Sequence, residues 1–169
     1  MKKSFIFFIA IFFLNFSSAI SEKHIVFLDL DFIVQNSNVG KSMIQKFDKK
    51  MKNNQKIIDE KFKKLIENEK SLVKKKNIIS KEEFEKELKV LRNERSKFEN
   101  LRKKTISDFN NSKQKSLQDL ISKINQILIN YSEQNKTSLI MNKKNLIIGK
   151  NELDITPQIL DIVNKEIKN

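Results

Sequence analysis

Between Gly40 and Gly149 the chain contains neither glycine nor proline, the residues that most often interrupt regular secondary structure. Pro157 is the only other strong breaker. A globular domain with many tight turns would need more of these residues. The composition is instead rich in Lys, Glu, Leu, Ile and Asn, which favours long helices. The sequence therefore predicts a mostly helical chain with few turns.

The first part of this region has an apolar residue at every seventh position: Ile44, Met51, Ile58, Leu65, Leu72 and Ile79. Such a repeat is typical of a coiled coil. The positions three residues further on are mostly polar, as at Asn54 and Lys61, so the apolar stripe is narrow. A narrow stripe can pack against one neighbouring helix but cannot bury a helix in a core.

A second helical pattern follows, with apolar residues at Phe84, Leu88, Leu91, Phe98, Leu101, Ile106, Phe109, Leu117, Leu120, Ile124, Leu128 and Tyr131. Its end, from Leu117 to Tyr131, is much more apolar than its beginning. We expect that end to be buried and the beginning to be exposed to solvent.

The residues between the two patterns decide whether they form one rod or a hairpin. Lys74 to Lys76 suit the last turn of a helix, and Asn77 can adopt the left-handed conformation that ends one. Ser80, followed by Glu83, has the form of a capping box that starts a new helix. The pattern predicts a helical hairpin with its tip at 77–80. A single unbroken rod is the alternative, since no glycine enforces the break.

Strand-like segments lie near both ends of the chain. His24 to Leu30 is an apolar run that predicts a buried strand. Thr137–Met141 and Leu146–Ile148 predict a β-hairpin, joined through the polar residues 142–145. A last helix is expected after Asp154 or Thr156 as its cap, with Pro157 in its first turn.

The predicted fold class is α+β and mostly helical. Residues 20–43 and 132–169 would form a small β body, and residues 44–131 a helical-hairpin arm. A sheet of three short strands is marginal in water on its own. We therefore expect other copies of the chain to complete the body, so that folding and assembly are coupled.

The first 19 residues have the layout of a secretory signal peptide. Lys2 and Lys3 precede an apolar run from Phe5 to Phe16, and small residues lead to predicted cleavage after Ala19. A transmembrane anchor is the alternative, but this run is shorter than the ~20 apolar residues that span a bilayer. The chain from Ile20 onward is therefore expected to be exported. It has no cysteine and so no disulfide.

Positive charge is concentrated on the predicted arm. The formal net charge is +13, and it falls by two when Lys2 and Lys3 leave with the signal peptide. Residues 41–81 contain 14 lysines and five acidic residues, whereas residues 82–134 contain 11 basic and nine acidic residues. A basic helix of this kind attracts polyanions or acidic proteins over roughly 8–10 Å.

The sequence argues against an enzyme. No nucleophile-elbow, phosphate-binding loop, zinc-protease or dinucleotide motif is present. One histidine, His24, and no cysteine make a zinc site improbable. Asp29 and Asp31 alternate with apolar residues, as residues on one face or at the end of a strand do. We therefore predict no catalytic, cofactor-binding or metal-binding residues.

Three segments resemble a known family: KHIVFLDLDFIVQNSNVGK (23–41), SLIMNKKNLIIG (138–149) and LDITPQIL (153–160). With the signal peptide and the charged helical hairpin between them, this layout resembles the Skp (OmpH-like) periplasmic chaperones. The resemblance covers the whole chain after Ala19 and is most specific at its two ends. The tip departs from the family pattern, because Asn77 and Ser80 stand where a glycine would be comfortable.

The resemblance implies a homotrimer in the periplasm that holds unfolded outer-membrane β-barrel proteins between its arms without ATP. The strands expected to form the trimerisation body contain Ile25, Val26, Phe27, Leu28, Leu139, Ile140, Met141, Leu146, Ile147 and Ile148. We expect client chains to be steered by Lys70, Lys74, Lys75, Lys76 and Lys81 and to contact Phe62, Leu65, Phe98 and Phe109. These four apolar residues could equally serve only to hold the hairpin together. An anionic lipid surface is a further candidate partner.

Two other functions fit parts of the sequence. A basic chain of pI about 9.8 binds nucleic acid or other polyanions in vitro, but an exported protein rarely meets DNA, so no nucleic acid partner is expected in the cell. A coiled-coil spacer of the cell envelope is the other, but it would need neither terminal strands nor a hairpin with a charged tip.

Overall fold

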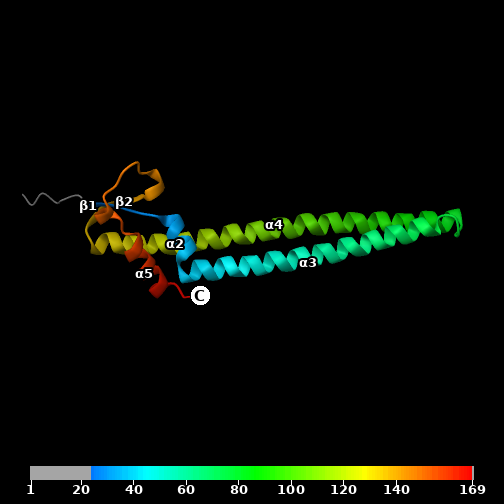
Figure 1. Cartoon of the computed structure of the whole chain (residues 1–169), viewed down its shortest axis with the longest axis horizontal. Helices are drawn as coiled ribbons and strands as arrows, with labels where there is room; N and C mark the ends of the chain where they lie inside the picture. The colour runs from blue at the N-terminus through cyan, green and yellow to red at the C-terminus, as the bar shows by residue number, and fades with distance from the viewer. Residues whose placement is uncertain (1–23, 169) are drawn as a thin grey trace, which may run out of the picture.

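The computed structural model describes residues 24–168, so the predicted signal peptide lies outside the described residues. Figure 1 shows a small body from which two long helices project side by side. The elements are β1 (His24–Leu28), α2 (Leu30–Asn36), α3 (Asn38–Lys75), α4 (Lys81–Gln134), β2 (Thr137–Asn142), the short 3₁₀ helices η2 (Lys143–Asn145) and η3 (Asn151–Leu153), and α5 (Thr156–Glu166). Within the described residues, no helix has both the length and the apolar content needed to cross a bilayer.

The helical hairpin is confirmed, and the unbroken rod is excluded. Helix α4 starts where predicted, because Ser80 Oγ accepts a hydrogen bond from the Glu83 amide at 3.2 Å. The predicted end of α3 was wrong in its mechanism. Within the described residues, Lys136 is the only non-glycine residue with positive φ, so Asn77 is not left-handed. The amides of Ile78 and Ile79 instead both donate to the Lys75 carbonyl, and this right-handed turn needs no special residue.

The strands pair differently from the prediction. The expected β-hairpin was wrong, because residues 143–145 form η2 and residues 146–148 are not a strand. Strand β2 instead pairs in parallel with β1, with Ile25 opposite Leu139 and Phe27 opposite Met141. The long hairpin of α3 and α4 returns the chain to the body, and this return brings β2 alongside β1.

The predicted first strand ends earlier than expected, at Leu28. Asp29 caps α2 by accepting a hydrogen bond from the Phe32 amide at 2.8 Å, and Asp31 lies in the first turn of that helix. Asp29 thus lies at the end of a strand, as one form of the prediction had it, but Asp31 belongs to a helix, and for Asp31 the prediction was wrong. Asp is one of the residues that favour the N-cap position of a helix, and here this preference prevails over the strand propensity of the neighbouring residues.

A tight turn then joins α2 to α3. Ser37 is fully buried and its hydroxyl accepts from the Gly40 amide at 3.1 Å. A Cβ atom at Gly40 would lie 1.7 Å from the Val34 carbonyl oxygen, so only glycine allows this close approach of the two helices.

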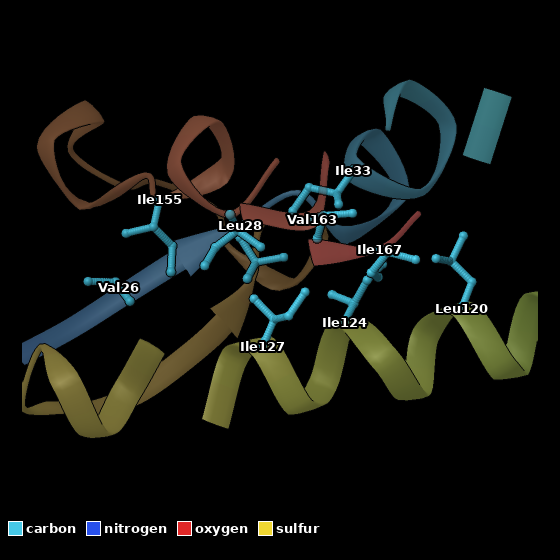
Figure 2. Close-up of a cluster of buried hydrophobic side chains, with 10 residues drawn as sticks. Val26, Leu28, Ile33, Leu120, Ile124, Ile127, Ile155, Val163 and Ile167 are labelled. Carbon is cyan, nitrogen blue, oxygen red and sulfur yellow. The ribbon is translucent and has the colours of Figure 1, made fainter. Parts of the chain in front are cut away.

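One cluster of buried side chains forms the core of the body (Figure 2). It combines residues from β1, α2, the body end of α4, and the C-terminal segment that includes α5. Its members are Val26, Leu28, Ile33, Leu120, Ile124, Ile127, Ile155, Ile159, Val163 and Ile167. The prediction that the last part of α4 is buried is thus confirmed on one face, while Leu117 and Ile129 remain exposed on others.

A polar junction of Asp29, Lys143, Asp154 and Thr156 joins the two ends of the chain. The Asp29 amide donates to Thr156 Oγ1 at 2.8 Å, and the Thr156 hydroxyl and amide both donate to Asp154. Lys143 Nζ lies 2.9 Å from the other carboxylate oxygen of Asp154. The cap position of α5 is Ile155, so the predicted caps were wrong in detail. Asp154 still binds the first amide of the helix, and Pro157 lies in its first turn.

Burial of the Asp154 carboxylate opposes its ionisation, but the hydrogen bonds from Thr156 and Lys143 outweigh burial and hold its pKa below the usual 3.8. The hydrogen bond to Asp154 in turn raises the pKa of Lys143. The charged form of Asp154 is therefore the form that the folded body favours.

We predict that Asp154 stabilises the fold at neutral pH and that this contribution is lost in acid. Because its folded pKa is lowered, the stabilisation is present above pH 3.8 and disappears as the pH falls through the folded value. Asp154→Asn should lower the free energy of unfolding by about 1–2 kcal/mol at pH 7. Urea unfolding of both proteins from pH 7 to pH 3 measures this, and the difference should shrink at low pH.

Asp161→Asn is the matched control, since Asp161 is an exposed aspartate of α5. It should change little at any pH. The free energies of unfolding of Asp154→Asn and of the unchanged chain could also differ by the same amount from pH 7 to pH 3. That result would contradict the role given to the Asp154 charge.

Candidate functional site

The arm is the most extended feature of the molecule, and its two helices meet through a series of side-chain contacts. Two aromatic pairs contribute, Phe47 with Phe109 edge to face and Phe62 with Phe98, each with ring centroids 5.8 Å apart. Nearer the tip the seam contains Leu65 and Leu72, which are 8% and 5% exposed. Asn68 donates to Glu94 at 3.0 Å, and Lys75 lies 2.9 Å from Glu87.

The seam is closed near the tip and open near the body. The seven-residue stripe is buried at Leu65 and Leu72, but Ile44 and Met51 are 43% and 52% exposed. Between the two aromatic pairs, α3 runs 15 residues from Phe47 to Phe62, while α4 runs 11 from Phe98 to Phe109. At 1.5 Å per residue these paths are roughly 22 and 16 Å long. Because α3 is about one turn longer here, its side chains cannot all keep a partner on α4.

A groove of about 610 Å³ opens between the two aromatic pairs. Its apolar lining comes from Met51, Ile58, Phe62, Phe98, Ile106 and Phe109. Polar side chains surround it, including Gln55, Asp59, Glu99 and Arg102. The arrangement offers apolar contact area along the side of the arm, together with groups that can hydrogen-bond to a peptide.

The four predicted client-contacting residues lie in different surroundings. Phe62 is half exposed, at 50%, and reaches the groove. Phe109 is partly buried at the other end of the groove, whereas Leu65 and Phe98 are buried in the seam. The structure thus joins Phe62, Phe98 and Phe109 around one groove and places Leu65 further out.

Sequence reasoning missed several exposed apolar residues of the arm, among them Met51, Ile57 and Ile106. Met51 was assigned to the packed stripe, and only the opening of the seam exposes it. Ile57 immediately precedes a stripe position, so it lies about 100° around the helix from the seam. Its position away from the seam could have identified Ile57 from the sequence as an exposed residue.

The basic residues near the tip are solvent-exposed. Of Lys70, Lys74, Lys75, Lys76 and Lys81, only Lys75 forms an ion pair within the described residues. The exposed acidic residues Glu82, Glu83 and Glu85 follow at the start of α4, so the positive charge of the tip lies mainly on its α3 side.

The residues predicted for the trimerisation body fall into two groups. Val26, Phe27 and Leu28 are buried within the chain itself, while Ile25 and Leu139 are 46% and 48% exposed. Gly149 packs closely against the ring of Phe27: a Cβ atom added at Gly149 would lie only 2.6 Å from it.

The other body residues lie on β2 and in the segment that follows it. Ile140, Met141 and Leu146 are partly buried, with Ile140 packed against the core. Ile147 and Ile148 project from the body almost completely exposed, at 103% and 91%.

No group of three or more His, Asp or Glu side chains that could hold a metal ion occurs within residues 24–168. The candidate site consists of the apolar groove, the tip with its lysines and the exposed residues of the sheet.

Comparisons with known proteins agree with this architecture. Residues 24–163 match the family model described as "Outer membrane protein (OmpH-like)". The structure is similar to the crystal structure of a protein from Caulobacter crescentus assigned as an OmpH-like outer membrane chaperone. The TM-score is 0.81, the sequence identity 16%, and the match covers 86% of each chain. Among curated proteins, no sequence matches.

The family match spans most of the chain, and it includes both the strands of the body and the whole arm. The chain therefore belongs to the OmpH-like (Skp) family of non-enzymatic, periplasmic chaperones.

Proposed function

We propose that this chain is an ATP-independent holdase that binds unfolded outer-membrane β-barrel proteins between the arms of a homotrimer and prevents their aggregation before membrane insertion. The observation that carries the proposal is the arm itself: a two-helix projection whose side is lined by exposed apolar residues and whose end is basic. An export signal at residues 1–19, cleaved after Ala19, would deliver it to the periplasm.

The exposed apolar surface of the body supports assembly. Within residues 24–168 the sheet has two strands, and they are parallel, a kind of sheet that proteins normally cover on both faces. Its inner face packs on the core through Val26 and Leu28. Ile25 and Leu139 are exposed on the sheet, and Ile147 and Ile148 project from the segment that follows. Further copies of the chain would remove this apolar area from water.

The groove of the arm supports client binding by many weak contacts. Phe62 and Ile106 line the groove and are each about half exposed, and Ile57 is similarly exposed on another face of α3. An unfolded barrel protein presents alternating apolar side chains that can exchange among such contacts. Individually weak contacts permit release without ATP, because the client is more stable once folded in the membrane.

Charge supports capture of the client. The first arm helix and the tip carry the excess of lysine, and acidic segments of a client would be drawn to them over roughly a Debye length. A spacer of the cell envelope would need neither this charge nor the groove.

The holdase role is tested by diluting a porin from urea into the mature protein and recording light scattering. The porin should stay soluble at about one trimer per client, on the assumption of one shared cavity per closed trimer. An unfolded soluble protein serves as the comparison client. Aggregation of the porin at the same rate with and without the protein would contradict the proposal.

We predict that the mature protein is a trimer of about 50–55 kDa, since the whole chain is 20.0 kDa before removal of the signal. Light scattering coupled to size exclusion measures the mass. Replacing Ile147 and Ile148 by Asp should dissociate it, because two charges would be buried in the interface. Val90→Asp with Ile129→Asp is the matched control on exposed helix positions. A stable, folded monomer of the unchanged chain would refute the assembly.

We predict that replacing Lys74, Lys75 and Lys76 by Glu slows client capture by about tenfold at low salt and flattens its salt dependence. Stopped-flow fluorescence of a labelled client measures the rate. The same change at Lys49, Lys50 and Lys52 alters the net charge equally, but nearer the body, and should have a smaller effect. Equal capture rates across salt concentrations for the tip variant and the unchanged chain would exclude steering by the tip.

We predict that Phe62→Ala accelerates client release several-fold with little loss of stability, because half of this side chain is exposed. Phe98→Ala should instead destabilise the arm by about 3 kcal/mol, since Phe98 is buried in the seam. Client dissociation rates and thermal unfolding separate the two effects. A release rate unchanged by Phe62→Ala would mean that this residue only packs the hairpin.

A further inference from the structure

Met51 carries the most accessible sulfur atom of residues 24–168. This part of the chain contains three methionines and no cysteine. Met51 is 52% exposed, whereas Met43 packs against the core of the body and Met141 is partly buried on β2. An oxidant in solvent therefore reaches Met51 more readily than the other two residues.

Met51 also differs from the rest of the seven-residue stripe of α3. The other members are isoleucines and leucines, and Leu65 and Leu72 are buried in the seam. Met51 instead lies where the seam is open, in the lining of the groove between the two helices. A methionine side chain is unbranched and polarisable, so it adapts to apolar partners of different shapes. In its reduced form Met51 thus adds adaptable apolar surface to the groove.

Oxidation of the Met51 sulfur would change the chemistry of this surface. Hydrogen peroxide transfers one oxygen atom to the thioether: an S–O bond forms, the O–O bond breaks, and the second oxygen leaves as water. Two electrons pass from the sulfur to the peroxide, and the product, methionine sulfoxide, is polar and can be reduced back by enzymes. A polar group beside Ile58, Ile106 and Phe109 would remove apolar contact area from the groove.

The surroundings of Met51 allow the sulfoxide to form without unfolding the arm. Asn54 and Gln55 follow Met51 by three and four residues on α3, and side chains at these spacings are neighbours on a helix. Both line the same groove, and their amide groups can donate hydrogen bonds to a sulfoxide oxygen. Because half of the Met51 side chain is already in solvent, its oxidation removes little packing.

We propose that Met51 is a site of reversible oxidation to methionine sulfoxide and that this modification regulates the groove of the arm. The reduced groove holds apolar client segments, and the oxidised groove releases them faster. The effect on release rests on the proposed holdase function, whereas the preferential oxidation of Met51 does not.

Preferential oxidation is measured by treating the mature protein with hydrogen peroxide and following each methionine by peptide mass spectrometry. Met51 should be oxidised about tenfold faster than Met43 and Met141, because its sulfur is more accessible. Thermal unfolding of the oxidised protein should match that of the untreated protein. Oxidation of Met51 no faster than that of Met141, or a loss of helix on oxidation, would overturn the proposal.

Regulation of the groove is measured by the dissociation rate of a labelled porin, after the peroxide has been removed so that the client is not oxidised. Oxidation should accelerate release from the unchanged chain several-fold. Met51→Leu should show one rate before and after peroxide, whatever that rate is. Met51→Leu with Val90→Met is the matched control, since Val90 is 59% exposed and is not among the groove residues. Oxidation at position 90 should leave its release rate unchanged.

Two results of the release experiment would overturn the proposal. One is an unchanged release rate when Met51 is fully oxidised. The other is an equal acceleration in Met51→Leu, which would assign the effect to Met43 or Met141. Either result, in a protein that holds the porin when untreated, would reject this inference alone. Aggregation of the porin at the same rate with and without untreated protein would reject the proposed function instead, together with the release step that rests on it.

Discussion

The structure depends on the packing of one face of α4 into the core of the body. Leu120, Ile124 and Ile127 meet residues from β1, α2 and α5, and several members of this cluster are completely buried (Figure 2). Because α4 is one continuous helix of 54 residues, the same helix that fills the core also forms half of the arm. A close-packed core fixes the direction of that helix, so the body determines where the arm points.

Away from the core, the arm has only its own two helices to stabilise it. Its packing is tight near the tip, where Leu65 and Leu72 are buried, and loosens toward the body, where α3 is about one turn longer than α4 between the aromatic pairs. Segments with few buried contacts open and flex more readily than cores. The groove lies in this loosely packed part of the arm, which we expect to open more readily than the tip.

The two ends of the molecule present opposite surfaces to possible partners. The body exposes uncharged apolar residues, Ile147 and Ile148 most completely. The tip exposes Ile78 between the lysines that end α3 and the acidic residues Glu82 and Glu83 that begin α4. About 55 Å along α3 separates the two surfaces.

Much of the architecture could be predicted because its causes are local. The helical hairpin follows from the absence of breakers, from the seven-residue repeat and from Ser80 before Glu83, all of which act within a few residues of the chain. The burial of Leu120 and Ile124 also follows from local periodicity. The terminal segments were similar enough to a known family to indicate the fold and the chaperone role.

Tertiary structure decided what depends on contacts between distant residues. The parallel pairing of β1 with β2 arises because the hairpin returns the chain to its starting point, and no local signal at residues 137–148 indicates that partner. The Asp29 amide meets the Thr156 hydroxyl, 127 residues further along the chain, only in the folded body. Phe62 is exposed and its partner Phe98 is buried because of how α3 and α4 are positioned against each other. The sequence by itself thus determined which segments are helical and where they turn, because helix formation and capping depend on interactions between residues close together in the chain. The strand partners, the groove and the burial of Phe98 rather than Phe62 depended on the geometry of the assembled chain.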